Sequence, residues 1–462
     1  MSKQIRLNAF AMNCVGHLSP GLWRHPRDQQ AARYTDIHYW IELAKTLERG
    51  KIDGLFLADV LGVYDVYHGN ADAALSAGAQ VPANDPLQIV PAMAAATEHL
   101  GFGITASVSF EHPFPFARRM STLDHLTRGR AGWNIVTSYL SSGARNLGLK
   151  QQLNHQQRYA LAEEYLEVCY KLWEASWDDD AVVADRKSGV YADPRKVHPI
   201  EHKGEHFEVP GFHLSQPSPQ RTPVLYQAGA SSRGKAFAAG NAECVFVAAP
   251  TKRILRDQVA DLRRLAVEAG RQASDVLVLN QLTVIVAPTD AEALAKLEDY
   301  RQYSDREGAL ALVSGWTGID FGQYAPDQVL RHVQSDAIQS AVDAFSAADP
   351  ERQWTAAEIA DYCALGGDGP LLVGSPQTVA DQLQAWVEET DVDGFNLSSL
   401  VAPETFADIV DLLVPELQAR GLFKREYEQG TLRHKLFGQG DRLGASHRAA
   451  KLRRNAPGSG EA

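Results

Sequence analysis

Cysteine is scarce in this chain and too widely spaced to organise a fold. Only four of the 462 residues are cysteines, namely Cys14, Cys169, Cys244 and Cys363, and they form no C-x-x-C pair. This spacing excludes a zinc ribbon and provides no disulfide framework. It favours a protein that works in a reducing compartment, so we expect a cytoplasmic location.

Long apolar runs and an excess of positive charge are missing as well. No run approaches the roughly 18 apolar residues of a membrane span, and residues 1–6 lack the apolar core of a signal peptide. Acidic residues outnumber basic ones by 57 to 45, which gives a net charge of −12. Because nucleic acids bind basic faces, we expect neither nucleic acid nor a membrane as a partner.

Segments of strand pattern and of helical pattern alternate along the chain. Residues 54–59 form an apolar run that ends in a carboxylate, which is typical of a parallel strand covered on both faces. The helix before it stops at Gly50, which we expect to adopt the left-handed conformation. We predict strands at 5–12, 54–59, 102–109, 131–138, 224–228, 244–248, 276–286 and 394–400, and helices at 36–50, 86–99, 114–128, 158–177, 232–240, 253–269, 376–389 and 404–420.

Eight strands, each followed by a helix, predict the α/β class and a (β/α)8 TIM barrel. An open dinucleotide-binding sheet would also alternate, but residues 13–17 follow the first strand without a G-x-G-x-x-G motif. We expect one domain over residues 1–440, with insertions at about 60–85, 139–222 and 287–372, and a basic, flexible tail at 441–462. Segments that follow strands lie on the catalytic face of a barrel.

Polar residues at the ends of the predicted strands are candidates for a site. Asp59 ends the second strand, and it either faces the barrel mouth or caps a turn. Ser107 and Ser109 lie two apart, which places both hydroxyls on one side of a strand. They either bind a polar heterocycle or satisfy local backbone groups. Asn134 and Ser138 end the fourth strand, and an amide suits the edge of a flavin.

A turn of small residues at 228–231 links the fifth strand to a helix. Its members are Ala228, Gly229, Ala230 and Ser231. Exposed N–H groups at such a helix N-terminus bind phosphate, and the alternative is an ordinary turn with a serine N-cap. We favour phosphate binding.

Other combinations of reactive residues point to no metal or nucleophile. Three histidines lie four apart from position 198 to 206, but Pro199 and Gly204 interrupt any helix there and H-E-x-x-H is absent. We therefore expect no metal. Cys14 and His17 follow the first strand and could form a nucleophilic pair, but a buried, unreactive cysteine is the commoner outcome.

Several motifs give the chain a family resemblance. They lie at residues 13–17, 21–26, 47–59, 119–130, 133–138, 218–223, 374–376 and 393–397. Through them the chain resembles the bacterial-luciferase-like FMN-dependent monooxygenases, in the branch of the nitrilotriacetate, dibenzothiophene-sulfone and long-chain alkane enzymes. The resemblance covers nearly the whole chain.

That resemblance implies the oxygenase component of a two-component system. A separate reductase would supply FMNH2, and O2 would react to a flavin C4a-(hydro)peroxide that oxygenates a small organic substrate. It also implies a homodimer or homotetramer. FMN contacts are implied at Asp59, Ser107, Ser109, Asn134, Ser138, Tyr139, Tyr159, Ala228, Gly229, Ala230 and Ser231, and catalytic pocket positions at Cys14, His17, Tyr64 and Gln80.

Two departures from the alkane enzyme's pattern bear on the substrate. Tyr139 stands where that enzyme has a histidine, and residues 308–313 contain no histidine. An apolar, organosulfur or halogenated substrate is therefore expected in place of a long-chain alkane. The alternatives are a deazaflavin-dependent hydride-transfer enzyme of the same superfamily, a metal-dependent barrel hydrolase, and a flavin-binding protein without catalysis.

Overall fold

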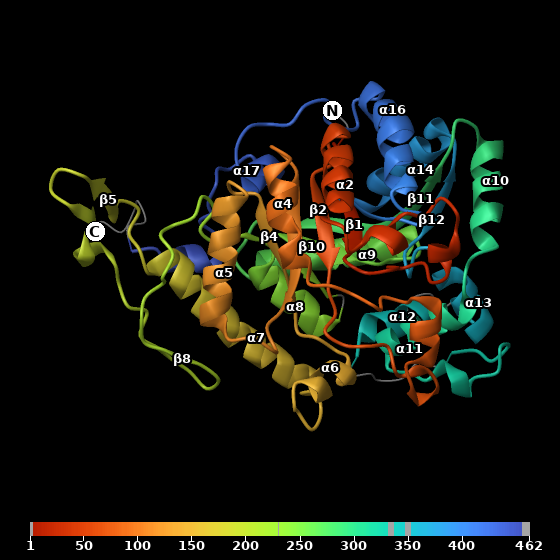
Figure 1. Cartoon of the computed structure of the whole chain (residues 1–462), viewed down its shortest axis with the longest axis horizontal. Helices are drawn as coiled ribbons and strands as arrows, with labels where there is room; N and C mark the ends of the chain where they lie inside the picture. Colours follow the sequence, from red (N-terminus) through yellow and green to blue (C-terminus); the bar gives the residue numbers. More distant parts are fainter. Residues whose placement is uncertain (1–2, 230, 331–336, 347–352, 455–462) are drawn as a thin grey trace.

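Eight parallel strands close into a barrel in the computed structural model, which describes residues 3–229, 231–330, 337–346 and 353–454 (Figure 1). The order around the barrel is β1, β2, β3, β4, β9, β10, β11 and β13, and β13 pairs again with β1. The predicted barrel and its strands are confirmed. Their bounds are Arg6–Met12, Gly54–Ala58, Gly101–Ser107, Ala131–Val136, Val224–Ala228, Cys244–Val247, Leu277–Val286 and Gly394–Ser398.

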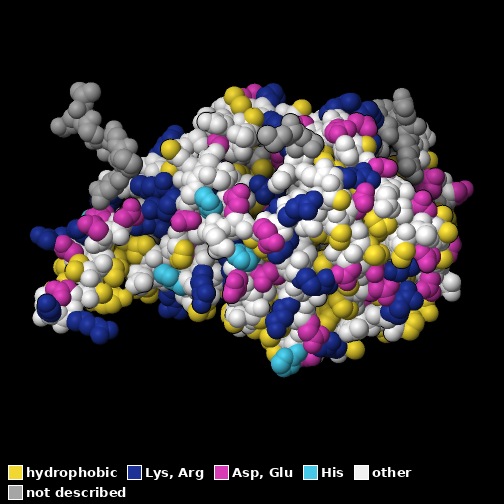
Figure 2. All heavy atoms as spheres, turned by 90° about the horizontal axis from the view of Figure 1, so that it is seen from above, with side chains coloured by type: hydrophobic (Ala, Val, Ile, Leu, Met, Phe, Trp, Pro, Cys, Tyr) yellow, Lys and Arg dark blue, Asp and Glu magenta, His cyan; other side chains and the backbone are white. Residues whose placement is uncertain are grey.

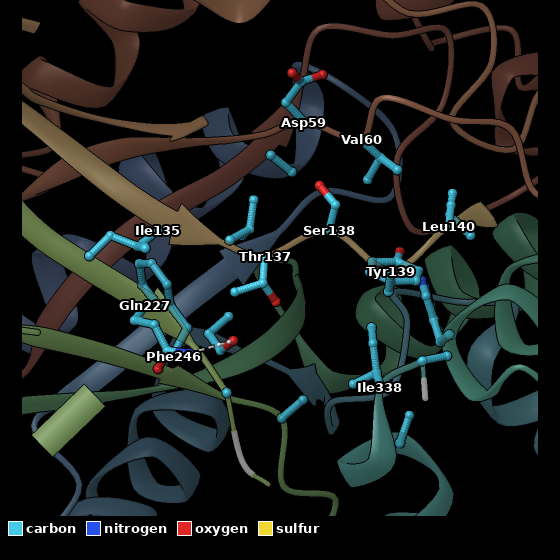
Figure 3. Close-up of a pocket in the computed structure, with 18 of the residues that line it drawn as sticks. Asp59, Val60, Ile135, Thr137, Ser138, Tyr139, Leu140, Gln227, Phe246 and Ile338 are labelled. Carbon is cyan, nitrogen blue, oxygen red and sulfur yellow. Dashed lines mark hydrogen bonds between the residues drawn. The ribbon is translucent and has the colours of Figure 1, made fainter. Parts of the chain in front are cut away.

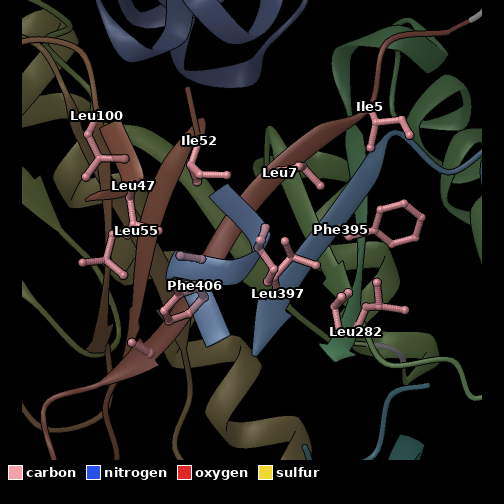
Figure 4. Close-up of a cluster of buried hydrophobic side chains, with 14 of the residues drawn as sticks. Ile5, Leu7, Leu47, Ile52, Leu55, Leu100, Leu282, Phe395, Leu397 and Phe406 are labelled. Atoms are coloured by element: carbon pink, nitrogen blue, oxygen red, sulfur yellow. The ribbon is translucent and has the colours of Figure 1, made fainter. Parts of the chain in front are cut away.

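The outward side chains of the strands form the main core with the surrounding helices. Leu7, Leu55 and Leu397 are almost completely buried and belong to one cluster with Leu47 and Phe406 from the helices (Figure 4). Burial of apolar side chains on both faces is what makes these short strands stable as a parallel sheet.

The inside of the barrel is filled by aromatic rings. Phe56 lies 5.0 Å from Phe10 and 4.3 Å from Phe246 between ring centroids, and Phe246 stacks on Tyr226. Gly132 makes room for them, because a Cβ there would lie 2.4 Å from the Tyr226 ring. The inside of the barrel is therefore a packed core and not an open channel.

The predicted helices are present with small shifts in their bounds. They are α2 Ile37–Arg49, α4 Val90–Ala95, α5 Pro113–Leu126, α7 His155–Tyr170, α8 Ser232–Asn241, α9 Lys252–Glu268, α14 Pro376–Thr390, α15 Glu404–Asp408 and α16 Val414–Ala419. The predicted helices at 158–177 and 404–420 each contain a π-helical turn, at Lys171–Ala175 and Ile409–Leu413.

The role expected of Gly50 was wrong. Its φ is −76°, and the next residue, Lys51, takes the left-handed conformation with φ 58°. Glycine is needed at position 50 for a different reason, because a Cβ there would lie 2.4 Å from Val410.

Long segments after β2, β4 and β11 carry the remaining elements. They include α3 Asp72–Ala77, α6 Ser141–Asn146, α10 Asp290–Arg301, α11 Arg306–Thr317, α12 Gln339–Ser346 and α13 Ala356–Cys363. After β4, the hairpin of β5 Val182–Asp185 and β6 Val190–Ala192 projects to one side of the barrel, as does the pair β7 His202–Lys203 and β8 Glu208–Val209 (Figure 1). A short ninth strand, β12 Leu371–Gly374, pairs with the far half of β11 and was not predicted.

The part of the C-terminal segment that the structure describes packs on this chain, although a flexible tail was expected from residue 441. Arg442 and Arg453 bind the buried Glu174 carboxylate at 3.0 and 2.8 Å. A buried carboxylate needs such partners. The two arginines therefore hold this segment against Glu174. Within the described ranges, no helix combines the length and apolar character that crossing a membrane requires.

Candidate functional site

A cavity of about 320 Å³ opens at the carboxyl ends of the barrel strands. Its wall includes Asp59 and Val60 after β2, Ser138 and Tyr139 after β4, and Phe246 of β10 (Figure 3). The size falls within the range of small-molecule sites. The predicted site residues that the structure brings together here are His17, Asp59, Tyr64, Gln80, Ser138, Tyr139, Tyr159, Ala228, Gly229 and Ser231.

Cys14 and Asn134 are not part of the cavity wall. The Cys14 thiol is buried and donates to the Gly16 carbonyl at 3.2 Å. Burial raises the pKa of this thiol, so it is protonated and unreactive at neutral pH. The Asn134 amide points into the barrel and donates to Thr105 Oγ1 at 3.0 Å.

Ser107 and Ser109 stand behind the wall, and the expectation that they share one strand face was wrong. Strand β3 ends at Ser107, and the Ser109 hydroxyl donates instead to the Thr137 carbonyl at 2.7 Å. Ser107 Oγ lies 2.7 Å from Ser138 Oγ. These two serines therefore support the residues that line the cavity. Ala230 lies outside the described residues.

A hydrogen-bonded group of aromatic side chains forms one wall of the cavity. Tyr64 donates its hydroxyl to Gln80 Oε1 at 3.0 Å, and Tyr139 Oη lies 2.7 Å from Tyr64 Oη. Since Tyr64 has one hydroxyl hydrogen, Tyr139 is the donor in the second bond. Trp316 Nε1 also donates to Tyr64, at 3.3 Å.

Backbone strain accompanies this wall. Gln80 and Ser138 both adopt the left-handed conformation with φ 56°, although neither is glycine. Such conformations cost on the order of 1 kcal/mol or more and concentrate at functional sites. In this backbone conformation both side chains lie at the cavity.

The charges at the barrel mouth are set by burial. Burial lowers the pKa of His17 to about 3, so its imidazole is neutral at physiological pH. The Asp59 carboxyl behaves in the opposite sense, because burial and then the charge of Asp85 raise its pKa to about 6. The site therefore holds a neutral histidine and a carboxyl that titrates near neutrality.

The turn between β9 and α8 has the features of an anion site. Ser231 caps α8 by accepting from the Gly234 N–H at 3.0 Å, and His155 Nε2 lies 3.4 Å from its hydroxyl. Tyr159 packs close by, since a Cβ at Gly234 would lie 2.9 Å from its hydroxyl. The helix N-terminus and these side chains favour a phosphate.

Several residues of the cavity wall were missed by the sequence analysis. Arg158 lines the cavity beside the predicted Tyr159. Because Arg158 directly precedes Tyr159 in the same helix, the sequence could have indicated it as a site residue. The others are His155, Gln281, Trp316, Asp368 and Asn396. For Asp368 the signal was the Gly-Gly-Asp-Gly run at 366–369. Among the described residues, no group of three His, Cys, Asp or Glu side chains is arranged to hold a metal ion.

Comparison with known proteins gives consistent matches over almost the whole chain. The model of the luciferase-like monooxygenase family matches residues 16–394. The dimethyl-sulfide monooxygenase of Hyphomicrobium sulfonivorans is 51% identical over 454 residues, which cover 98% of this chain and 94% of the relative. The crystal structure of DmoA from the same organism matches with a TM-score of 0.91, over 98% of this chain and 96% of that one.

Two further proteins are similar over the same length. The long-chain alkane monooxygenase of Geobacillus thermodenitrificans is 49% identical over 98% of this chain and 99% of the relative. A crystal structure of long-chain alkane monooxygenase matches with a TM-score of 0.90, over 98% of this chain and 100% of that one. The structure of a riboflavin lyase with modified FMN and riboflavin is 34% identical, with a TM-score of 0.92 over 98% of this chain and 100% of that one.

Proposed function

Because the chain belongs to the luciferase-like monooxygenase family, a family of flavin-dependent monooxygenases, we propose that it is the oxygenase component of a two-component system. Its substrate would be a small apolar, organosulfur or halogenated molecule. FMNH2 would come from a separate reductase, since the sequence has no G-x-G-x-x-G motif for a nicotinamide cofactor. The observation that carries the proposal is one cavity whose wall includes both the turn before α8 and the aromatic side chains of Tyr64, Tyr139 and Trp316.

The residues present fit FMN. At the turn, Gly229 allows the Gln227 amide to pack close to the backbone, since a Cβ there would lie 2.3 Å from Gln227 Nε2. The buried Gln227 Oε1 has no hydrogen-bond partner among the described residues. Ser231 and Tyr159 would hold the phosphate, and Asp59, Ser138 and Tyr139 would contact the ring system. Reduced FMN, when bound, supplies the two electrons that activate O2.

The chain's own side chains would position the substrate and exclude water. The aromatic group of Tyr64, Tyr139 and Trp316 fixes the shape of the chamber through its hydrogen bonds. Leu18, Leu61, Leu140 and Ile338 add apolar surface to the same cavity. A dry chamber protects reactive species from unproductive decay. The neutral His17 would serve as a hydrogen-bonding group at the barrel mouth.

For a thioether substrate the balance of the reaction is simple. One oxygen atom of O2 adds to a lone pair on sulfur. The other atom leaves as water after taking up two electrons and two protons from the reduced flavin.

The experiment supplies the purified chain with FMN, a flavin reductase, NADH and 18O2. Dimethyl sulfide, a medium-chain alkane and a halogenated aromatic compound serve as candidate substrates. Incorporation of one 18O atom into a product, detected by mass spectrometry, is expected for at least one class. Oxidation of FMNH2 without any labelled product in the whole panel, or activity only with a deazaflavin and without O2 uptake, would overturn the proposal.

A further inference from the structure

A turn of three glycines and one aspartate brings a carboxylate into the cavity. Gly366 and Gly367 adopt φ values of 97° and 85°. A Cβ at Gly366 would lie 2.1 Å from Thr283 Oγ1, and one at Gly369 would lie 1.7 Å from Gln281 Oε1. Glycine is therefore required around Asp368, both by conformation and by close approach. The only side chain in this run is the carboxylate that lines the cavity.

The turn is pinned to the barrel, so the carboxylate has a defined position. Gln281 Nε2 of β11 donates to the Gly366 carbonyl at 2.7 Å, and the Gly366 N–H donates to Ser19 Oγ at 3.1 Å. The buried Leu18 side chain packs against Gly367. Polar groups held in this way are preorganised for a ligand.

Asp368 is enclosed by the protein, and its remaining exposed surface belongs to the cavity. The hydrogen bond assigned to its carboxylate comes from its own backbone N–H. Among the described residues, no other group forms a hydrogen bond or ion pair with this side chain. Burial raises the pKa of the carboxyl to about 6, so most of it is ionised at pH 7.5. An ionised carboxylate in such surroundings needs a partner.

Among the described residues of the same cavity wall, some buried amide oxygens lack a hydrogen-bond donor. Gln281 Oε1 and Asn396 Oδ1 are buried in the same wall and have no hydrogen-bond partner among the described residues. Tyr139 gives its hydroxyl hydrogen to Tyr64. The charge of Asp368 contributes to raising the pKa of Tyr139, after burial and the neighbouring Tyr64. Arg158 also lines the cavity, but it precedes Tyr159 at the proposed phosphate site.

From this arrangement we infer that Asp368 determines substrate specificity by binding a protonated amino group on an otherwise apolar or organosulfur substrate. The ammonium group offers positive charge and hydrogen-bond donors to the Asp368 carboxylate. The same carboxylate, together with Asp59, disfavours substrates that carry a carboxylate. This inference deepens the proposed function and rests on it.

Three matched thioethers test the inference. They are 3-(methylthio)propylamine, its isostere butyl methyl sulfide, and 3-(methylthio)propionate. With the reductase-coupled enzyme at pH 7.5, we expect the KM for the amine to be at least about 10-fold lower than for the isostere, as for a charge-assisted hydrogen bond. We expect the propionate to be the poorest substrate. In Asp368→Asn the KM advantage of the amine over butyl methyl sulfide should disappear.

A binding measurement separates this inference from the proposed function. Calorimetric titration of the amine into the enzyme loaded with oxidised FMN requires no turnover. Tighter binding of the amine than of the isostere, lost in Asp368→Asn, supports the inference even if no thioether is oxygenated. A lack of oxygenation of every thioether would count against the proposed function alone. Equal binding of the amine and its isostere by the native enzyme, or an amine preference unchanged in Asp368→Asn, overturns the inference.

The matched control is Asp361→Asn. Asp361 is an exposed aspartate of α13 that pairs with Arg306 on the surface. The Asp361→Asn substitution removes the same charge from the same part of the chain without touching the cavity. The preference for the amine should therefore persist in this variant. Circular dichroism and the melting temperature of Asp368→Asn establish that this variant is folded.

Discussion

The hydroxyl of Tyr139 lies 2.7 Å from the hydroxyl of Tyr64, and the direction of this hydrogen bond is fixed by Gln80. Burial raises the pKa of both phenols, that of Tyr64 to about 12. The pair is therefore neutral over the whole physiological pH range. The two phenols thus bring no titratable base to this wall at physiological pH.

Tyr64 is the centre of this network, so replacing it should lower stability and kcat more than replacing Tyr139. Tyr64→Phe leaves buried Gln80 Oε1 without its donor and removes the acceptor of Tyr139 and Trp316. We expect a loss of about 1–3 kcal/mol in unfolding free energy and a larger fall in kcat than for Tyr139→Phe. Urea unfolding and coupled turnover measure the two effects. Equal effects of Tyr64→Phe and Tyr139→Phe on stability and turnover would contradict the role given to Tyr64.

Asp59 should make the flavin-free protein less stable as pH rises. Its pKa is about 6 in the folded protein because of burial and then the charge of Asp85, against an ordinary value of 3.8. The folded state therefore binds this proton more tightly, and stability falls between about pH 4 and pH 6. Asp59→Asn should be more stable than the native chain by about 1–3 kcal/mol at pH 8 and about equal to it below pH 4. A difference that is the same at both pH values would contradict the burial argument.

Ser231 should matter for FMN more than for riboflavin. Ser231→Ala removes the N-cap of α8 and a hydroxyl from the proposed phosphate site. We expect about 1 kcal/mol less stability and roughly 10-fold weaker FMN binding, with riboflavin affinity unchanged. Fluorescence titration measures both affinities. Ser375→Ala removes the equivalent cap of α14, so it should lose the stability and keep the FMN affinity.

The projecting hairpin should lie in the interface of a homodimer or homotetramer. Val183, Val190 and Tyr191 are exposed on β5 and β6, Tyr191 by 62%, and hydrophobic side chains gather on this projecting end of the molecule (Figure 2). Exposed apolar groups of this kind mark interaction sites. Val183→Ser combined with Tyr191→Ser should lower the mass measured by light scattering toward that of one chain. Leu126→Ser, at an exposed leucine of α5, should leave the mass unchanged, and an unchanged mass in the double variant would exclude this hairpin from the interface.

The sequence by itself determined the barrel. Alternating apolar patterns are local properties, and they located β1–β4, β9–β11 and β13 within a few residues of their positions. The short β12 was not predicted because its four residues show no distinctive hydrophobic periodicity. The small-residue turn before α8 was also readable, since a serine N-cap is a local signal.

Only the tertiary structure decided which polar side chains meet in the cavity. Ser109 turned away because β3 ends two residues earlier, and Cys14 is covered beside Gly16. Asp368 enters the cavity because contacts with Ser19 and Gln281, both distant in sequence, hold its glycine turn. The direction of a side chain beyond the end of a strand depends on such non-local contacts, and a single sequence does not record them.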